Sequence, residues 1–245
     1  MGEERHRRKT LITKVMKKVL ILVEGQTEEA FVKNVLSPHL SSFSLIAVPV
    51  ICRTRRTESG KTFKGGVSSF ARIEKQILSL LGDTSAILVT TMLDYYGLPQ
   101  IPNIRLLPAD SPTERVKTIE RAVEEEIARK TSQLGTPNRF VAYISLHEFE
   151  ALLFSDTDAI ANQLGSENRA DVESVRQTFK PEEIDDDSTT CPSARLKHIY
   201  PKYKKRVDGP LRASRIGISA IRSECPHFDS WLTRIEKIGH VAPQV

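Results

Sequence analysis

Four short apolar runs alternate with stretches of helical periodicity, and this alternation constrains the fold more than any other feature. Residues 18–23 read KVLILV, an uninterrupted apolar run of strand length. Such runs are typical of strands buried on both faces of a parallel sheet. Further runs of this kind lie at residues 43–52, 86–93 and 139–146. The pattern predicts an α/β fold with a mostly parallel, four-stranded sheet.

Between these runs, apolar side chains recur three and four residues apart, as they do on the buried face of a helix. We expect helices over residues 27–40, 67–81 and 112–130. Because each helix lies between two strands in the sequence, the helices should flank the sheet.

The composition changes after residue 155. An acidic stretch at residues 181–187 reads PEEIDDD, and a basic stretch at residues 195–206 reads RLKHIYPKYKKR. Short helical patterns surround them, and the last of these contains Trp231 at core spacing. We therefore divide the chain into a basic N-terminal extension (1–17), an α/β domain (18–155) and a mostly helical C-terminal region (156–245).

The overall composition indicates a globular protein. Of the 245 residues, 39% are hydrophobic and 27% are charged, which is ordinary for a folded domain. No apolar run approaches the roughly 18 residues that a membrane helix needs, and the N-terminus lacks the apolar region of a secretory signal. The three cysteines, Cys52, Cys191 and Cys225, are too scattered for a disulfide framework. We expect a cytoplasmic protein with no membrane partner.

The formal net charge is +5, and the basic residues are clustered. Such patches suit a polyanion such as nucleic acid, although solvated faces of a basic protein would have the same composition. The candidate nucleic-acid contacts are Arg53, Arg55, Arg56, Lys61, Lys64, Lys202, Lys204 and Lys205.

Acidic residues follow three of the four predicted strands. Glu24 follows the first strand, Asp94 the third, and Glu148 and Glu150 the fourth. In open α/β sheets, ligands bind at the carboxyl ends of the strands. Carboxylates gathered there repel one another unless a cation lies among them, and Mg²⁺ or Mn²⁺ is the usual partner of such oxygen ligands. We therefore interpret these four acids as metal ligands.

Two further questions concern the geometry of these acids. Glu28 falls in the first turn of the predicted helix, where it can lean back toward Glu24. Glu148 and Glu150 point the same way only if the backbone is extended. If a helix begins at His147 instead, only one of them can face the metal. His147 itself is equally consistent with a packed or capping residue and with a ligand or proton shuttle.

Four segments resemble a bacterial family of uncharacterised Toprim-like proteins over nearly the whole chain. They are VEGQTEEAFV, TTMLDYYGLP, HEFEALLFSD and CPSARLKHIYPKYKKRVDGPL. The Toprim fold is shared by topoisomerases, bacterial primases, recombination-repair proteins and OLD-type nucleases. The resemblance implies that the α/β domain of residues 18–155 is a Toprim-like domain.

The resemblance also implies roles for the acids. Glu24 corresponds to an acid/base or metal-binding glutamate, and Asp94 opens an Asp-x-Asp pair whose second place is held here by Tyr96. The Glu148-Phe149-Glu150 segment resembles a Glu-x-Glu motif of OLD-type nucleases, and Glu28 resembles their helix acid.

From these roles we expect a metal-dependent nuclease that uses Mg²⁺ or Mn²⁺ on DNA or RNA, acting in phage defence with an ATPase partner. Because Tyr96 replaces one carboxylate, a catalytically weakened module that binds nucleic acid or protein is the alternative. A small-molecule phosphotransfer enzyme on the same fold is a third interpretation.

Overall fold

The computed structural model describes most of the chain. The described residues are 15–52, 70–99, 101, 104, 111–135, 137–184 and 189–240. Most of the basic N-terminal extension and the segment from Arg53 to Lys64 lie outside them.

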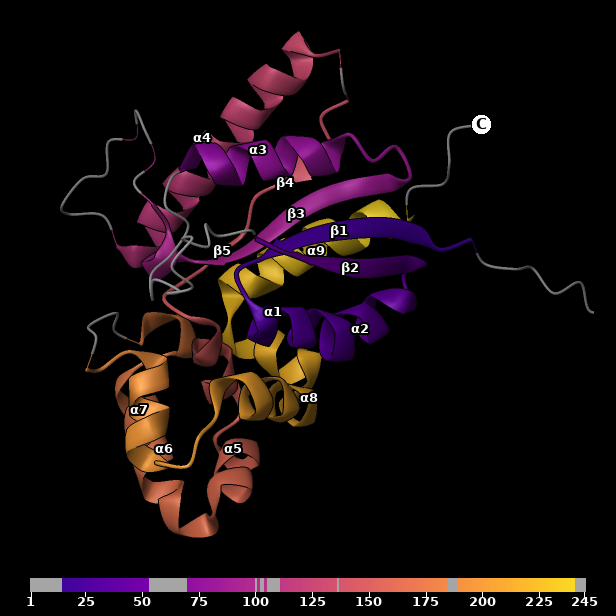
Figure 1. The fold of residues 1–245 in the computed structure, drawn as a ribbon. Coiled ribbons are helices and arrows are strands. Elements are labelled where there is room, and N and C mark those ends of the chain that lie inside the picture. Colours follow the sequence, from indigo (N-terminus) through magenta and orange to yellow (C-terminus); the bar gives the residue numbers. More distant parts are fainter. Residues whose placement is uncertain are drawn as a thin grey trace, which may run out of the picture.

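A parallel sheet forms the centre of the molecule (Figure 1). Its strand order is β2-β1-β3-β4, and β5 also pairs with β3; every pairing is parallel. The α/β prediction is therefore confirmed. The strands are β1 (Lys17–Val23), β2 (Leu45–Ile51), β3 (Ala86–Asp94), β4 (Phe140–Val141) and β5 (Ile144–Ser145).

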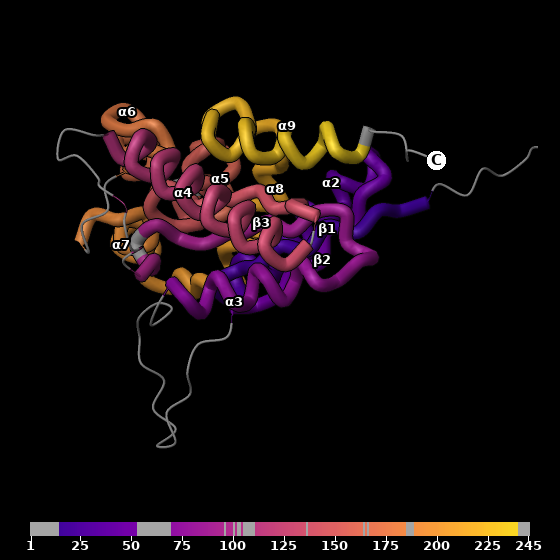
Figure 2. The backbone as a smooth tube through the Cα atoms, turned by 90° about the horizontal axis from the view of Figure 1, so that it is seen from above, coloured from indigo at the N-terminus to yellow at the C-terminus, as the bar shows by residue number. Residues whose placement is uncertain are grey.

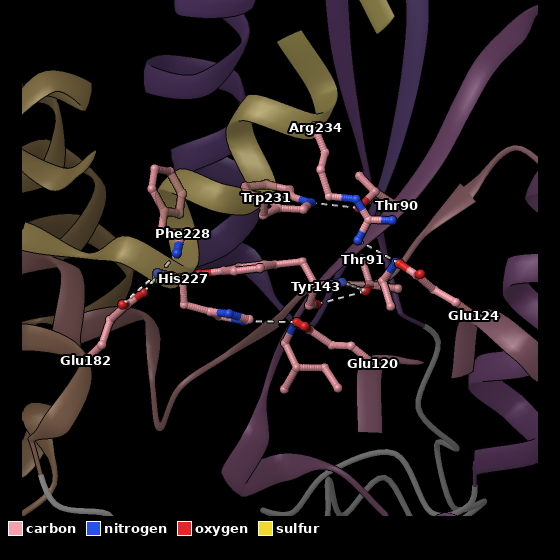
Figure 3. A network of polar contacts seen from close by, with 12 residues as sticks. Thr90, Thr91, Glu120, Glu124, Tyr143, Glu182, His227, Phe228, Trp231 and Arg234 are labelled. Atoms are coloured by element: carbon pink, nitrogen blue, oxygen red, sulfur yellow. Dashed lines mark hydrogen bonds and ion pairs between the residues drawn. The ribbon is translucent and has the colours of Figure 1, made fainter. Parts of the chain in front are cut away.

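The predicted fourth strand is broken into β4 and β5. Between them, Tyr143 bonds to a side chain of β3 instead of its backbone. The Thr91 hydroxyl donates to the Tyr143 carbonyl at 2.8 Å and accepts from the Tyr143 N–H at 2.9 Å (Figure 3). A side chain thus replaces the backbone ladder at this point, and periodicity alone does not reveal such a replacement.

The outer side of this broken strand is closed by α4 (Pro112–Gln133). Glu124 accepts a hydrogen bond from the Ala142 N–H at 2.9 Å, and Glu120 accepts one from the Ile144 N–H at 2.8 Å. Both acceptors lie on one face of the helix because they are four residues apart. Backbone groups that would otherwise template pairing with another chain are therefore satisfied within the molecule.

The predicted helices are present in the described residues. Residues 27–40 fall in α1, η1 and α2, which run on without a break, and residues 70–81 form α3. The helices and helical turns besides α4 are α1 (Gln26–Phe31), η1 (Val32–Leu36), α2 (Ser37–Ser41), α3 (Phe70–Leu81), η2 (Tyr95–Gly97), η3 (Phe149–Ser155), α5 (Thr157–Leu164), η4 (Ser166–Asn168), α6 (Arg169–Thr178), η5 (Pro181–Glu183), α7 (Pro192–Ile199), α8 (Lys205–Glu224) and α9 (Pro226–His240).

Helices cover both faces of the sheet (Figures 1 and 2). On β1, Leu20 and Leu22 pack into the core that includes α3 and α4. Val19, Ile21 and Val23 face the other way, into the core that includes α1, α2, α8 and α9. This alternation follows from the two-residue period of a strand. It explains why β1 is a continuous apolar run.

The C-terminal region returns to the sheet through α9. Trp231 stacks on Tyr143 with ring centroids 4.3 Å apart, and its indole N–H donates to Thr90 Oγ1 at 2.8 Å (Figure 3). Helices α5, α6 and α7 form a separate group below the sheet in Figure 1. One buried apolar cluster joins residues of both predicted regions, and the boundary at residue 155 stays a prediction.

No helix among the described residues combines the length and apolar character that crossing a membrane requires.

Candidate acidic site at the ends of the strands

Glu24 and Glu28 lie at the tip of β1. Glu24 follows the strand directly, and Gly25 precedes the first turn of α1. The carboxylate of Glu28 folds back and accepts a hydrogen bond from the Gly25 N–H at 2.9 Å. Burial and the nearby charge of Glu28 raise the pKa of Glu24. The two acids therefore share one corner, as expected.

Asp94 joins this corner because β3 lies beside β1 in the sheet. Its backbone N–H donates to Glu24 Oε2 at 3.3 Å. Asp94 is 7% exposed, and its Oδ1 has no hydrogen-bond partner among the described residues. Burial raises the pKa of Asp94 well above its usual range; Glu28 and Glu24 add to this, while Lys205 opposes it. We call Glu24, Glu28 and Asp94 the strand corner.

Glu148 and Glu150 reach the site through an unusual turn after β5. His147 has a φ of 66°, a left-handed conformation that is rare for residues with a side chain and that reverses the chain. Glu148 is then extended, and η3 begins at Phe149. The sequence left two alternatives open: a strand that continues through Glu150, or a helix that begins at His147. Neither is present, because the strand ends before His147 and the helical turn begins after Glu148. We call Glu148 and Glu150 the η3 pair.

Phe149 anchors this turn. Its ring packs edge-on against Phe31 of α1 with centroids 5.2 Å apart, and it is completely buried. Because Phe149 points into the core, Glu148 and Glu150 are held on either side of it. His147 is also buried, at 2% exposure.

Lys205, the first residue of α8, lies against the η3 pair. Its ammonium nitrogen is 2.8 Å from Glu150 Oε2 and 4.0 Å from Glu148 Oε1. Burial disfavours the charged ammonium, but the attraction of Glu150, Asp94 and Glu148 outweighs it and raises the pKa of Lys205. Burial raises the pKa of Glu150 even beside this cation. Lys205 therefore stays charged and compensates part of the acidic cluster.

Ser193 and Tyr203 hold the η3 pair in place. The backbone N–H of Ser193 donates to Glu148 Oε2 at 2.9 Å, and its hydroxyl donates to Glu148 Oε1 at 3.1 Å. The Tyr203 hydroxyl donates to Glu150 Oε1 at 3.3 Å. Each oxygen of both carboxylates is therefore met by a donor or by Lys205. Glu150 Oε2 has no other hydrogen-bond partner among the described residues, so its compensation is the 2.8 Å ion pair with Lys205.

The sequence alone did not single out Ser193 and Tyr203, and it assigned Lys205 to a basic surface patch. The one signal that pointed to them is their common segment, CPSARLKHIYPKYKKRVDGPL, which supports the resemblance described above. Gly209 in that segment allows α8 to approach closely. A β-carbon there would lie 3.2 Å from both the Phe149 ring and the Tyr203 hydroxyl.

The residues predicted to contact nucleic acid differ in their surroundings. Lys202 and Lys204 are exposed beside the site, whereas Lys205 is in the acidic cluster. Arg53, Arg55, Arg56, Lys61 and Lys64 lie outside the described residues, as does the side chain of Tyr96. The role of these residues stays a prediction.

The donor chemistry of the strand corner suits a hard cation. The polar atoms it offers are carboxylate oxygens, and Asp94 Oδ1 is a buried acceptor that no donor among the described residues reaches. Within the described ranges, no three His, Cys, Asp or Glu side chains are grouped closely enough to hold a metal ion in this conformation. Mg²⁺ requires fewer protein ligands, because it commonly keeps several waters and takes one or two carboxylates.

The fold and the site together define an α/β protein with a carboxylate–lysine cluster at the carboxyl ends of a parallel sheet. The chain belongs to the family described as Domain of unknown function (DUF4276), whose model matches residues 23–236 and so includes every acid of the cluster and Lys205. Comparisons with curated proteins and with solved structures found no significant match.

Proposed function

We propose that this protein hydrolyses phosphodiester bonds of DNA or RNA with the help of Mg²⁺ or Mn²⁺ bound at the strand corner. The observation that carries the proposal is Asp94 Oδ1, a buried carboxylate oxygen that receives no hydrogen bond from the part of the chain that the structure describes, beside two further carboxylates. A cation at this point would remove the repulsion that raises the pKa of Asp94 and Glu24.

The surrounding residues support this chemistry. Glu24 and Asp94 would hold the ion, which when bound supplies Lewis acidity toward a phosphoryl oxygen and toward water. Lys205 offers a positive charge to a phosphate oxygen, and the η3 pair orients that charge. Lys202 and Lys204 would contact the phosphate backbone without reading sequence.

We also propose the class of nuclease and its cellular setting. A Toprim-like nuclease of the bacterial cytoplasm, acting in phage defence beside an ATPase, would have an acid at the tip of β1 and another at the end of β3. Glu24 and Asp94 hold these places.

The test is cleavage of single- and double-stranded DNA and RNA by the purified protein at low salt, with Mg²⁺, Mn²⁺ or chelator. We expect cleavage with either ion, and we expect Asp94→Asn and Glu24→Gln to lower it about 100-fold or more. Glu29→Gln is the matched control, because Glu29 pairs with Lys33 on the surface of α1 at 2.6 Å. If the wild type cuts nothing, either alone or together with an ATPase partner, the proposal is wrong.

A second function is favoured by two observations. Lys205 already compensates the η3 pair, and Tyr96 replaces a carboxylate of the Asp-x-Asp pattern, so a module that only binds nucleic acid or a partner protein is the alternative. The alternative predicts equal nucleic-acid binding with chelator and with Mn²⁺, and no cleavage in either condition.

A further inference from the structure

The five acids of the cluster fall into two groups that differ in how their charge is compensated. In the η3 pair, Glu148 accepts two hydrogen bonds from Ser193, and Glu150 accepts one from Tyr203 and pairs with Lys205 at 2.8 Å. These donors come from α7, from α8 and from the segment between them. The η3 pair therefore needs no further cation.

The strand corner is compensated much less, although the charge of Lys205 also favours the ionised forms of Asp94 and Glu24. Glu24 accepts a 3.3 Å hydrogen bond from the Asp94 N–H, and Glu28 accepts one from Gly25. Asp94 Oδ1 has no partner among the described residues, although Asp94 is only 7% exposed. A buried polar oxygen without a partner is costly, so this corner is where a bound cation is needed.

We propose that the site binds a single divalent cation, at the strand corner, and that Lys205 permanently takes the place of a second cation at the η3 pair. This inference rests on the proposed function and specifies how many ions it uses. A second ion bound by Glu150 would have to displace the Lys205 ammonium from 2.8 Å, and the two positive charges would repel each other.

Lys205 is suited to this role because it contacts the acids and remains accessible. Its side chain is 34% exposed, so a phosphate oxygen can reach the ammonium while the acids hold it. A lysine ammonium is a compact point charge with three donors, which allows it to contact a carboxylate and a phosphate together. Gly209, one turn further along α8, allows the close approach that positions it.

The test counts bound Mn²⁺ by electron paramagnetic resonance of the free ion, using the full-length protein after treatment with chelator. We expect one tightly bound ion for the wild type, and none for Asp94→Asn. Lys205→Ala should bind two, because it frees the η3 pair for a second ion. Lys205→Arg retains the positive charge and should bind one, as should the control Lys202→Ala, which removes an exposed lysine beside the site.

The possible failures are distinguishable. Two ions in the wild type, one ion in Lys205→Ala, or two in Lys202→Ala would each overturn the inference and leave the proposed function standing. No bound ion in the wild type would overturn both. If Lys205→Ala does not fold, the counts for the wild type and Lys205→Arg decide, since two ions in either would show that the lysine does not exclude a second ion.

Discussion

Gly97 lies directly against the carboxylate of Glu24. A β-carbon at position 97 would stand 2.9 Å from both Glu24 Oε1 and Oε2, closer than real contacts allow. Gly97 ends η2, the turn that follows Asp94. The segment LDYYGLP therefore contributes to the site twice, through the Asp94 carboxylate and through the absence of a side chain at Gly97.

Gly97→Ala should displace the Glu24 carboxylate while leaving the fold intact, because a flexible side-chain end can move where backbone cannot. We expect Mn²⁺ affinity to fall by about 10-fold, comparable to the loss of a residue that orients a ligand. The melting temperature without metal should stay within about 2 °C of the wild-type value, which corresponds to about 0.5–1 kcal/mol for a chain of this length.

A double variant tests whether Gly97→Ala lowers Mn²⁺ affinity by displacing Glu24. If Gly97 acts through Glu24, adding Gly97→Ala to Glu24→Gln should cause little further loss of affinity. Additive losses would show that Gly97 acts independently of Glu24.

Glu182 holds the start of α9. Its two carboxylate oxygens accept hydrogen bonds from the backbone N–H groups of His227 and Phe228, both at 2.9 Å (Figure 3). Glu182→Gln replaces one accepting oxygen by an NH2 group, which only donates and would face a backbone N–H donor, so it should lower the free energy of unfolding by about 1–2 kcal/mol.

The neighbouring Glu183 provides the matched control, because it is exposed. Glu183→Gln should change the free energy of unfolding by less than about 0.5 kcal/mol in the same urea titration. Equal effects of the two substitutions would show that Glu182 does not cap α9.

His227 should make stability depend on pH. Its Nε2 lies 3.0 Å from Glu120 Oε1, and Glu182 adds a second negative charge nearby. Burial disfavours the charged imidazole, but the bond to Glu120 raises the pKa of His227 above its ordinary 6.5. The stabilisation that charged His227 contributes through Glu120 is therefore complete below the pKa of His227 in the unfolded chain. It is lost as pH rises through the higher pKa of His227 in the folded protein.

The measurement is urea unfolding of the wild type and His227→Gln at pH 6 and at pH 9. The free energy of unfolding should be higher for the wild type than for the variant, and this difference should be larger at pH 6 than at pH 9. A difference that is the same at both pH values would mean that His227 is not charged in the folded protein at pH 6.

The features that the sequence could predict are local ones. β1 and β3 are recognisable because both of their faces are buried, and Glu24 and Asp94 because each stands directly beyond an apolar run or at its end. Parallel strands bring their carboxyl ends to one edge, so the meeting of these two acids follows from the topology.

The features that the sequence could not predict depend on contacts between distant segments. Lys205 resembles its exposed neighbours Lys202 and Lys204 until the packing of α8 places it on Glu150. The break in the fourth strand depends on the Thr91 hydroxyl in the same way. Neither contact leaves a periodic signal.

The most direct test of the account is a crystal structure of the protein soaked in Mn²⁺, with the ion located by its anomalous scattering. We expect one peak within about 2.0–2.6 Å of carboxylate oxygens of Glu24 and Asp94, with Lys205 still paired with Glu150. A strand corner without a peak at saturating Mn²⁺, or a peak bound by Glu148 and Glu150 instead, would contradict the claim that the strand corner is the metal site.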